Sequence, residues 1–253
     1  MERIGQILFE NVLVPSVYFN PKLAPVHSAA VSVRGEGAVL LGGTGGVGKT
    51  SLEMELCLQP DYAFVSDDIS ILDKDGFVYP NLSYPKIYGY NLESKDEVRD
   101  ILFSQMKLHD RMAWKLKHRL FGASGVRRKI SPETLYQDVI NQKIAIDRYF
   151  ILLKTDVEEI ELHQLTAEEA ANATLQVMKT EYAQFNNHLF WHKYNRELLG
   201  QKTILDIDLV FKNWLGIYTK VFSEIPVFEV KIPLSIPHEA FLRQAGELLS
   251  SAN

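Results

Sequence analysis

One eight-residue stretch, Gly43-Thr44-Gly45-Gly46-Val47-Gly48-Lys49-Thr50, constrains the fold more than any other feature of the chain. It reads glycine, four further residues, then Gly-Lys-Thr, and it lies between a predicted strand (38–42) and a predicted helix (49–58). Glycines let the backbone curl until successive N–H groups converge on an anion, and the start of the helix adds its partial positive charge. The pattern predicts a phosphate-binding loop.

Each polar residue of this loop has a chemical role in the prediction. Lys49 places a cation near the outermost phosphates, and the Thr50 hydroxyl is a hard oxygen ligand suited to Mg²⁺. The predicted nucleotide-binding residues are 43–51, which end with Ser51. The motif leaves open whether a bound nucleoside triphosphate works as a switch, is hydrolysed for work, or donates its phosphoryl group.

Composition excludes several classes of protein. With 253 residues, 46% hydrophobic and 23% charged, the chain is long enough and apolar enough for a folded core, so a disordered or fibrous protein is excluded. Its one cysteine, Cys57, allows neither an intrachain disulfide nor a cysteine-based zinc cage. No signal peptide or membrane span is recognisable, so we expect a cytoplasmic protein without a membrane partner. The net charge of −5 disfavours nucleic acid as the partner.

Periodicity and turn signals predict the α/β class, with a mixed sheet and flanking helices. Strands are expected at 27–33, 38–42, 62–66, 69–72, 77–79, 144–153, 158–165 and 227–232, and the first two form a hairpin around 34–37. Helices are expected at 49–58, 94–120, 187–198 and 206–221, after the capping box at 166–169, and after Pro237. We expect one domain, comprising an N-terminal extension (1–26), a nucleotide-binding core (27–92), a helical basic insertion (93–143) and a C-terminal α/β part (144–253).

Two neighbouring carboxylates, Asp67 and Asp68, follow the predicted strand 62–66. In an α/β phosphate-binding fold that strand is expected beside strand 38–42, so that both side chains point toward the γ-phosphate. One carboxylate can support Mg²⁺ while the other takes the proton of an attacking hydroxyl. The pair also suits an aspartate-rich surface turn.

The run HSAAVSVRGEGAVLLGGTGGVGKTSLEMELCLQPDYAFVSDDISIL, residues 27–72, resembles the catalytic domain of HPr kinase/phosphorylase and related serine kinases. The shared features are a histidine opening a strand, a second strand leading into the phosphate loop, a helix, and a strand ending in Asp-Asp. Residues 120–127 are similar to a Leu-Phe-Gly-Ala segment of that family. The resemblance implies a phosphoenolpyruvate-carboxykinase-like phosphate-loop fold.

The resemblance also implies an activity, which is transfer of the γ-phosphate of ATP, with Mg²⁺, to a hydroxyl group. The acceptor it implies is a serine in a protein or peptide, and a small-molecule alcohol is the alternative. Lys49 and Thr50 would serve the phosphates and Mg²⁺, Asp67 would be the base, Asp68 would support the metal, and His27 would lie near them. Only 26 residues precede His27, too few for the family's separate N-terminal domain, so neither the same protein substrate nor the reverse phosphorylase reaction is implied. Assembly into a homo-oligomer stays open.

Residues 107–129 form a basic segment, with eight Lys or Arg and one acid, Asp110. Leucine and methionine recur every four residues in it, and so do lysine and arginine, which predicts an apolar stripe beside a basic one on a helix. Arg127 and Arg128 are candidates for neutralising charge on the transferred phosphoryl group. The segment would suit an acidic or phosphorylated partner, although a solvated surface helix explains the pattern equally well.

Two functions of other classes remain open. A GTPase would need an Asp-x-x-Gly switch and a base-reading Lys-x-Asp motif, and 73–76 and 154–156 match them imperfectly. Asp73–Gly76 is better explained as a tight hairpin turn. The other alternative is a nucleotide-gated binding module whose hydrolysis only switches a partner surface.

Overall fold

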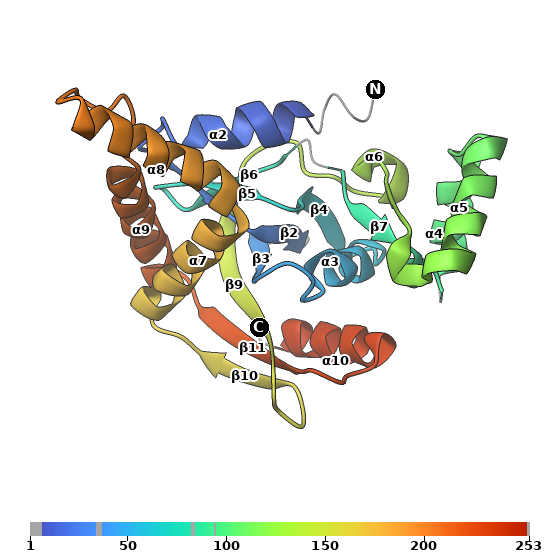
Figure 1. Cartoon of the computed structure of the whole chain (residues 1–253). Helices are drawn as coiled ribbons and strands as arrows, with labels where there is room; N and C mark the ends of the chain where they lie inside the picture. The colour runs from blue at the N-terminus through green and yellow to red at the C-terminus, as the bar shows by residue number, and fades with distance from the viewer. Residues whose placement is uncertain (1–6, 34–36, 82–83, 94, 252–253) are drawn as a thin grey trace.

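The computed structural model describes residues 7–33, 37–81, 84–93 and 95–251 (Figure 1). A mixed β-sheet lies at its centre. Side by side stand β4 (Tyr62–Ser66), β2 (Ser28–Val33), β3 (Ala38–Gly42), β9 (Ile144–Thr155), β11 (Val227–Pro233) and β10 (Glu161–Gln164). The first residues of β9 also pair with β6 (Phe77–Tyr79), which continues through β5 (Ser70–Asp73) to β1 (Leu23–Val26). The sheet therefore branches at β9.

Strand direction decides where the loop after β3 opens. β3, β9 and β11 are parallel, whereas β2 is antiparallel to both β3 and β4. β3 and β4 therefore run in the same direction, and their carboxyl ends meet at one edge of the sheet.

The expectation that strand 62–66 lies beside strand 38–42 is wrong. β2 lies between them, because β2 and β3 form a hairpin with Ser28 opposite Gly42 and β4 pairs with the other edge of β2. The predicted hairpin turn at Arg34–Glu36 lies outside the described residues. The aspartates after β4 still reach the loop after β3, because the two strands end at the same edge.

Apolar side chains of β3 alternate between two cores, as the two-residue period of a strand requires. Leu40 joins a core with α7 (Ala167–Glu181) and α9 (Ile207–Ser223). Leu41 joins a second core on the opposite face, with α3 (Lys49–Cys57) and α10 (His238–Ser251). In Figure 1 these helix pairs lie on the two sides of the sheet. The strand that leads into the glycine-rich loop is thus buried on both faces.

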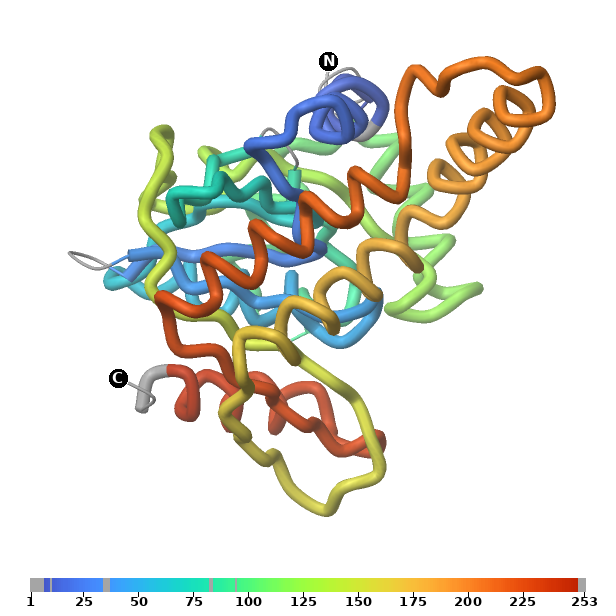
Figure 2. The backbone as a smooth tube through the Cα atoms, turned by 90° about the vertical axis from the view of Figure 1, so that its left-hand side faces the viewer, coloured from blue at the N-terminus to red at the C-terminus, as the bar shows by residue number. Residues whose placement is uncertain are grey.

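Short elements extend the second core beyond α3, on the right of Figure 1. They are β7 (Lys86–Tyr88), η2 (Gly89–Leu92), α4 (Asp96–Ser104), α5 (Leu108–Phe121), η3 (Ala123–Gly125), β8 (Arg127–Lys129) and α6 (Pro132–Leu135). β7 and β8 form a separate antiparallel pair. On the other side, η1 (Phe9–Leu13) and α2 (Val14–Val17) cover the first core. Figures 1 and 2 show α8 (Ala183–Leu198) reaching outward from the body.

The single helix expected at 94–120 is wrong, because α4 ends at Ser104 and α5 begins at Leu108. α4 buries Val98 and Leu102, and α5 buries Trp114. In one continuous helix at about 100° per residue, Trp114 would point roughly 120–160° away from Val98 and Leu102. The break turns Trp114 back onto the core. Among the described residues, no helix is long and apolar enough to cross a bilayer.

Candidate functional site

The loop between β3 and α3 is held in shape at both ends. Gly43 has φ +125°, and a Cβ there would lie 2.4 Å from the carbonyl oxygen of Leu152. Gly48 has φ +111°, and a Cβ there would lie 2.6 Å from the Phe241 ring of α10. Only glycine combines this backbone conformation with so little space. The loop is therefore clamped between β9 and α10.

Lys49, the first residue of α3, folds back over the loop. Its Nζ donates to the carbonyl oxygens of Gly43 at 2.9 Å and Thr44 at 2.8 Å. Burial lowers the pKa of Lys49 to about 8, although Asp67 and Glu181 work in the opposite direction. The ammonium is thus poorly solvated and only partly compensated by negative charge, so a bound anion would stabilise it.

Asp67, which is only 1% exposed, lies beside the end of the loop. Its Oδ1 accepts a hydrogen bond from the Thr50 hydroxyl at 3.0 Å. Burial, with the charge of Asp68, raises the pKa of Asp67. The carboxylate is therefore a stronger base than an ordinary aspartate.

Asp68 has a different environment. It adopts φ +69°, a left-handed conformation that aspartate tolerates in turns, and the Asn81 side chain holds this turn by donating to the carbonyl oxygens of Asp67 and Ile69. Lys86 Nζ lies 2.7 Å from Asp68 Oδ2. Burial alone would raise the pKa of Asp68, but the Lys86 ammonium outweighs burial, so that the pKa of Asp68 is lowered. The two adjacent carboxylates thus have pKa values shifted in opposite directions.

His27 and Glu181 complete this side of the site. His27 Nε2 lies 3.9 Å from Asp68 Oδ1, and Nδ1 lies 3.4 Å from Glu181 Oε1. Burial lowers the pKa of His27 to about 4, so the imidazole is neutral at pH 7. Glu181 Oε1 also accepts from the Gly45 N–H at 2.7 Å. The Glu181 carboxylate, at the end of α7, thus accepts a hydrogen bond from a loop amide that a bound phosphate would use.

These groups surround one cavity of about 440 Å³. It is lined by the loop and the start of α3, the paired aspartates, and residues from distant segments: His27, Gly45, Gly46, Gly48, Lys49, Thr50, Ser51, Asp67, Asp68, Lys86, Tyr88, Tyr90, Ser124 and Glu181. Sequence reasoning missed Lys86, Tyr88, Tyr90, Ser124 and Glu181 as site residues. Among these five residues, only Ser124 could have been suspected from the sequence, because it falls in segment 120–127, which is similar to a segment of the kinase family.

The structure places the remaining candidates outside this lining. Gly43 and Val47 are buried under the loop, and Thr44 is exposed. Arg127 and Arg128 lie on β8; Arg127 Nη1 is 3.5 Å from the Tyr88 hydroxyl. Asp73–Gly76 is a hairpin turn, in which Asp73 Oδ1 accepts from the Phe77 N–H and Gly76 has φ +81°.

A second buried acid lies one helical turn beyond Lys49. Glu53 is fully buried, with the Tyr136 hydroxyl and the Cys57 thiol as polar neighbours that work against its pKa shift, but neither of its carboxyl oxygens makes a well-aligned hydrogen bond within the described residues. Burial raises the pKa of Glu53 well above its usual range, and the Asp67 charge adds to the effect. The neutral acid is therefore favoured, in the core behind Asp67.

The donor atoms at the loop suit Mg²⁺ more than a transition metal. Thr50, Asp67 and Asp68 line the cavity and offer hydroxyl and carboxylate oxygens, and Thr50 is hydrogen-bonded to Asp67. Mg²⁺ is held in proteins by one or two such oxygens together with water and substrate phosphates. No group of three or more His, Cys, Asp or Glu side chains in the described part of the chain is arranged to hold a metal by itself.

No protein-family model matches the chain, and no curated protein matches it at a significant level. Among solved structures, it is similar to the HPr(Ser) kinase/phosphatase from Coxiella burnetii. The comparison covers 90% of each chain, at 12% sequence identity and a TM-score of 0.36. This is a distant structural similarity.

Proposed function

We propose that the chain is a Mg²⁺- and ATP-dependent kinase that transfers the γ-phosphate to a hydroxyl group, most favourably a serine of a protein or peptide. The observation that carries the proposal is Asp67, a buried carboxylate with a raised pKa that accepts a hydrogen bond from the loop's own Thr50. A phosphate-binding loop alone serves switches and motors as well. A strong base beside the phosphates is what a hydroxyl acceptor requires.

Loop and helix residues would hold the triphosphate. The amides that follow Gly45, with the start of α3, converge on the phosphates, and the Lys49 ammonium is freed from the Gly43 and Thr44 carbonyls to contact them. Since Lys49 is poorly solvated, its interaction with a phosphate is strong. Thr50 and Asp68 would hold Mg²⁺, which supplies charge neutralisation when bound.

Transfer would proceed by in-line displacement. The acceptor oxygen forms a bond to the γ-phosphorus while the bond from that phosphorus to the β–γ bridging oxygen breaks, leaving ADP. The acceptor's proton passes to Asp67. Asp68 is the weaker base, because Lys86 holds its charge, and neutral His27 can donate one hydrogen bond to a phosphate oxygen without repelling Lys49.

The nucleoside is expected to leave the loop toward Tyr88 and Tyr90. Ser51 follows Thr50, at the end of the loop where the α-phosphate is bound. Asn91 donates to the Ser51 hydroxyl at 2.7 Å, which fixes η2 against this end. The Tyr88 and Tyr90 rings are stacked, with centroids 5.3 Å apart, and form an aromatic wall suited to a base.

The test is incubation of the protein with γ-labelled ATP and an extract of its own cells. We expect label in a discrete protein or peptide that yields phosphoserine on hydrolysis, and none with Lys49→Ala. Label in a small metabolite would replace the polypeptide acceptor with a small-molecule alcohol. Label recovered only as free phosphate would overturn the kinase and favour a switch, and tighter binding of GTP than ATP would favour a GTPase.

A further inference from the structure

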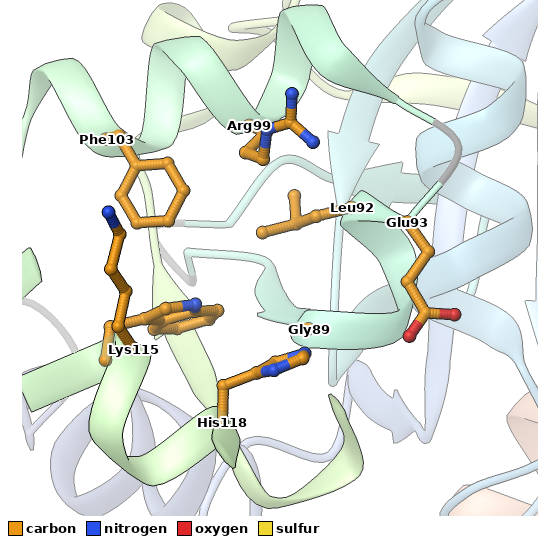
Figure 3. Close-up of a pocket in the computed structure, with 8 residues that line it drawn as sticks. Gly89, Leu92, Glu93, Arg99, Phe103, Lys115 and His118 are labelled. Atoms are coloured by element: carbon orange, nitrogen blue, oxygen red, sulfur yellow. The ribbon is translucent and has the colours of Figure 1, made fainter. Parts of the chain in front are cut away.

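A second cavity, of about 410 Å³, is lined by residues of η2, α4 and α5 (Figure 3). Gly89 lines this second cavity, whereas its chain neighbours Tyr88 and Tyr90 line the first. The two cavities are therefore separated by one turn of backbone. A ligand chain that crosses this turn would pass from one cavity to the other within a few residues, at about 3.3 Å per extended residue.

The floor of the second cavity is apolar and aromatic. Leu92 comes from η2, Phe103 from α4 and Trp114 from α5. The Phe103 and Trp114 rings meet edge to face, with centroids 6.3 Å apart, and Trp114 is the residue by which α5 is anchored to the core. Such a floor suits an apolar or aromatic side chain.

The rim is mainly basic. Figure 3 shows Arg99 of α4 on one side of the cavity and Lys115 and His118 of α5 on others, with Glu93 as the acid of the rim. Arg99 is paired with Asp96 at the surface. Within the described ranges, neither Lys115 nor His118 makes an ion pair with an acid.

Further cations extend this rim in two directions, so the basic surface is longer than a compact ligand needs. On α5, Arg111 lies one helical turn before Lys115, and Lys107 is the N-cap residue that directly precedes the helix. Toward the catalytic cavity, Arg127 of β8 lies opposite Tyr88, and Lys129 lies opposite Lys86. The cations thus follow a path from α5, past the second cavity, to the residues beside Asp68.

The exposed leucines of α5 do not belong to this path. Leu108 and Leu116 lie roughly 120–200° around the helix from Trp114, on its outer face. The occupant of the cavity is therefore defined by the apolar floor and the cations beside it.

We propose that the second cavity and the β8 cations bind an acidic segment of the phosphate-accepting polypeptide. Its carboxylates would lie next to Lys115, His118 and Arg127, and one apolar or aromatic side chain would pack on Phe103 and Trp114. The acceptor hydroxyl, a few residues along, would then enter the cavity of Asp67. This inference rests on the proposed kinase function, because it names the acceptor's second point of attachment.

The test uses two pools of 13-residue peptides with a central serine and degenerate flanks, one containing Asp and Glu and the other lacking them. Phosphorylation of each pool is compared for the wild type, for the double variant Lys115→Glu/His118→Glu, and for Lys117→Glu. Lys117 is exposed on the same helix and does not line the cavity, so Lys117→Glu is a charge-reversal control outside the cavity. Binding of each fluorescent pool is measured separately by anisotropy, with a non-hydrolysable ATP analogue present.

We expect the wild type and Lys117→Glu to prefer the acidic pool by about tenfold or more, and the double variant to lose that preference, since a tenfold change needs only about 1.4 kcal/mol. Binding of the acidic pool that depends on Lys115 and His118, without phosphorylation of either pool, would support the docking site but overturn the proposed kinase function. Equal binding of both pools by the wild type, or an unchanged preference in the double variant, would overturn the docking site whatever the activity.

Discussion

Replacing Lys49 by methionine is expected to stabilise the protein without nucleotide while removing its affinity for phosphate. Lys49 is 7% exposed, and burial lowers its pKa from 10.5 to about 8. At about 1.4 kcal/mol per pH unit, keeping this ammonium charged inside the fold at pH 7 costs roughly 3 kcal/mol. The carbonyls of Gly43 and Thr44 lose their hydrogen-bond donor in the variant, and this loss offsets about 1–2 kcal/mol of the stabilisation. A net stabilisation of about 1–2 kcal/mol remains.

The pH dependence gives the sign of this effect independently. Because the folded-state pKa of Lys49 is below the unfolded value, the penalty is complete below about pH 8 and disappears as the pH rises toward 10.5. The stability difference between Lys49→Met and wild type should therefore be largest at pH 7 and shrink by pH 10.

The assay is urea unfolding of both proteins at pH 7 and pH 10, followed by thermal unfolding at pH 7 with and without Mg-ATP. Lys86→Met is the control, because it removes a cation that is paired with Asp68 at 2.7 Å and should destabilise the fold. Mg-ATP should raise the midpoint of the wild type and leave that of Lys49→Met unchanged. A Lys49→Met variant less stable than wild type at pH 7, or a difference that grows with pH, would refute the reasoning.

Three further substitutions test other parts of the site. Glu181→Gln removes the negative charge that stands on the Gly45 amide, so calorimetry should show ATP affinity raised about three- to tenfold, and weaker binding would make Glu181 a nucleotide ligand instead. Glu53→Gln should flatten the pH dependence of the free energy of unfolding. A carboxyl group whose pKa is raised in the folded state favours folding most at a pH below its unfolded-state pKa, and this contribution is lost as the pH rises. A variant with the same pH profile of unfolding as the wild type would contradict a neutral Glu53. Gly48→Ala combines φ +111° with a Cβ 2.6 Å from Phe241 and should cost roughly 2–4 kcal/mol in urea unfolding, whereas a cost below about 1 kcal/mol would show that α10 does not clamp the loop.

Short-range patterns predicted the elements around the glycine-rich loop at 43–50 well. The β2–β3 and β5–β6 hairpins and the strand before Asp67 follow from alternation and turn chemistry, which are local properties. The split of the helix at 94–120 was missed, because it depends on the direction of the core that Trp114 must reach. β7 and β8 were missed as well, since each is three residues long and pairs with the other across some 40 residues of chain.

The candidate site likewise combines residues that are close in sequence with residues that only folding brings together. The loop lysine, the Thr50 hydroxyl and the paired aspartates lie within one strand-loop-helix-strand segment, so their proximity could be predicted from the sequence, whereas the roles expected of them stay predictions. Glu181 is 136 residues from Gly45 and ends an ordinary amphipathic helix, so no local pattern distinguishes it. The opposite pKa shifts of Asp67 and Asp68 depend on burial and on Lys86, which only the folded chain brings close.

Asp67→Asn separates nucleotide binding from the proton transfer proposed for Asp67. The variant keeps the shape of the side chain and removes the proposed base, so calorimetry should show Mg-ATP binding within about twofold of wild type while phosphoryl transfer to the acceptor falls by about 10²–10⁴-fold. Asp68→Asn, measured in parallel, should weaken the Mg²⁺ dependence of ATP binding more than Asp67→Asn does. Transfer by Asp67→Asn at a near wild-type rate would contradict the account.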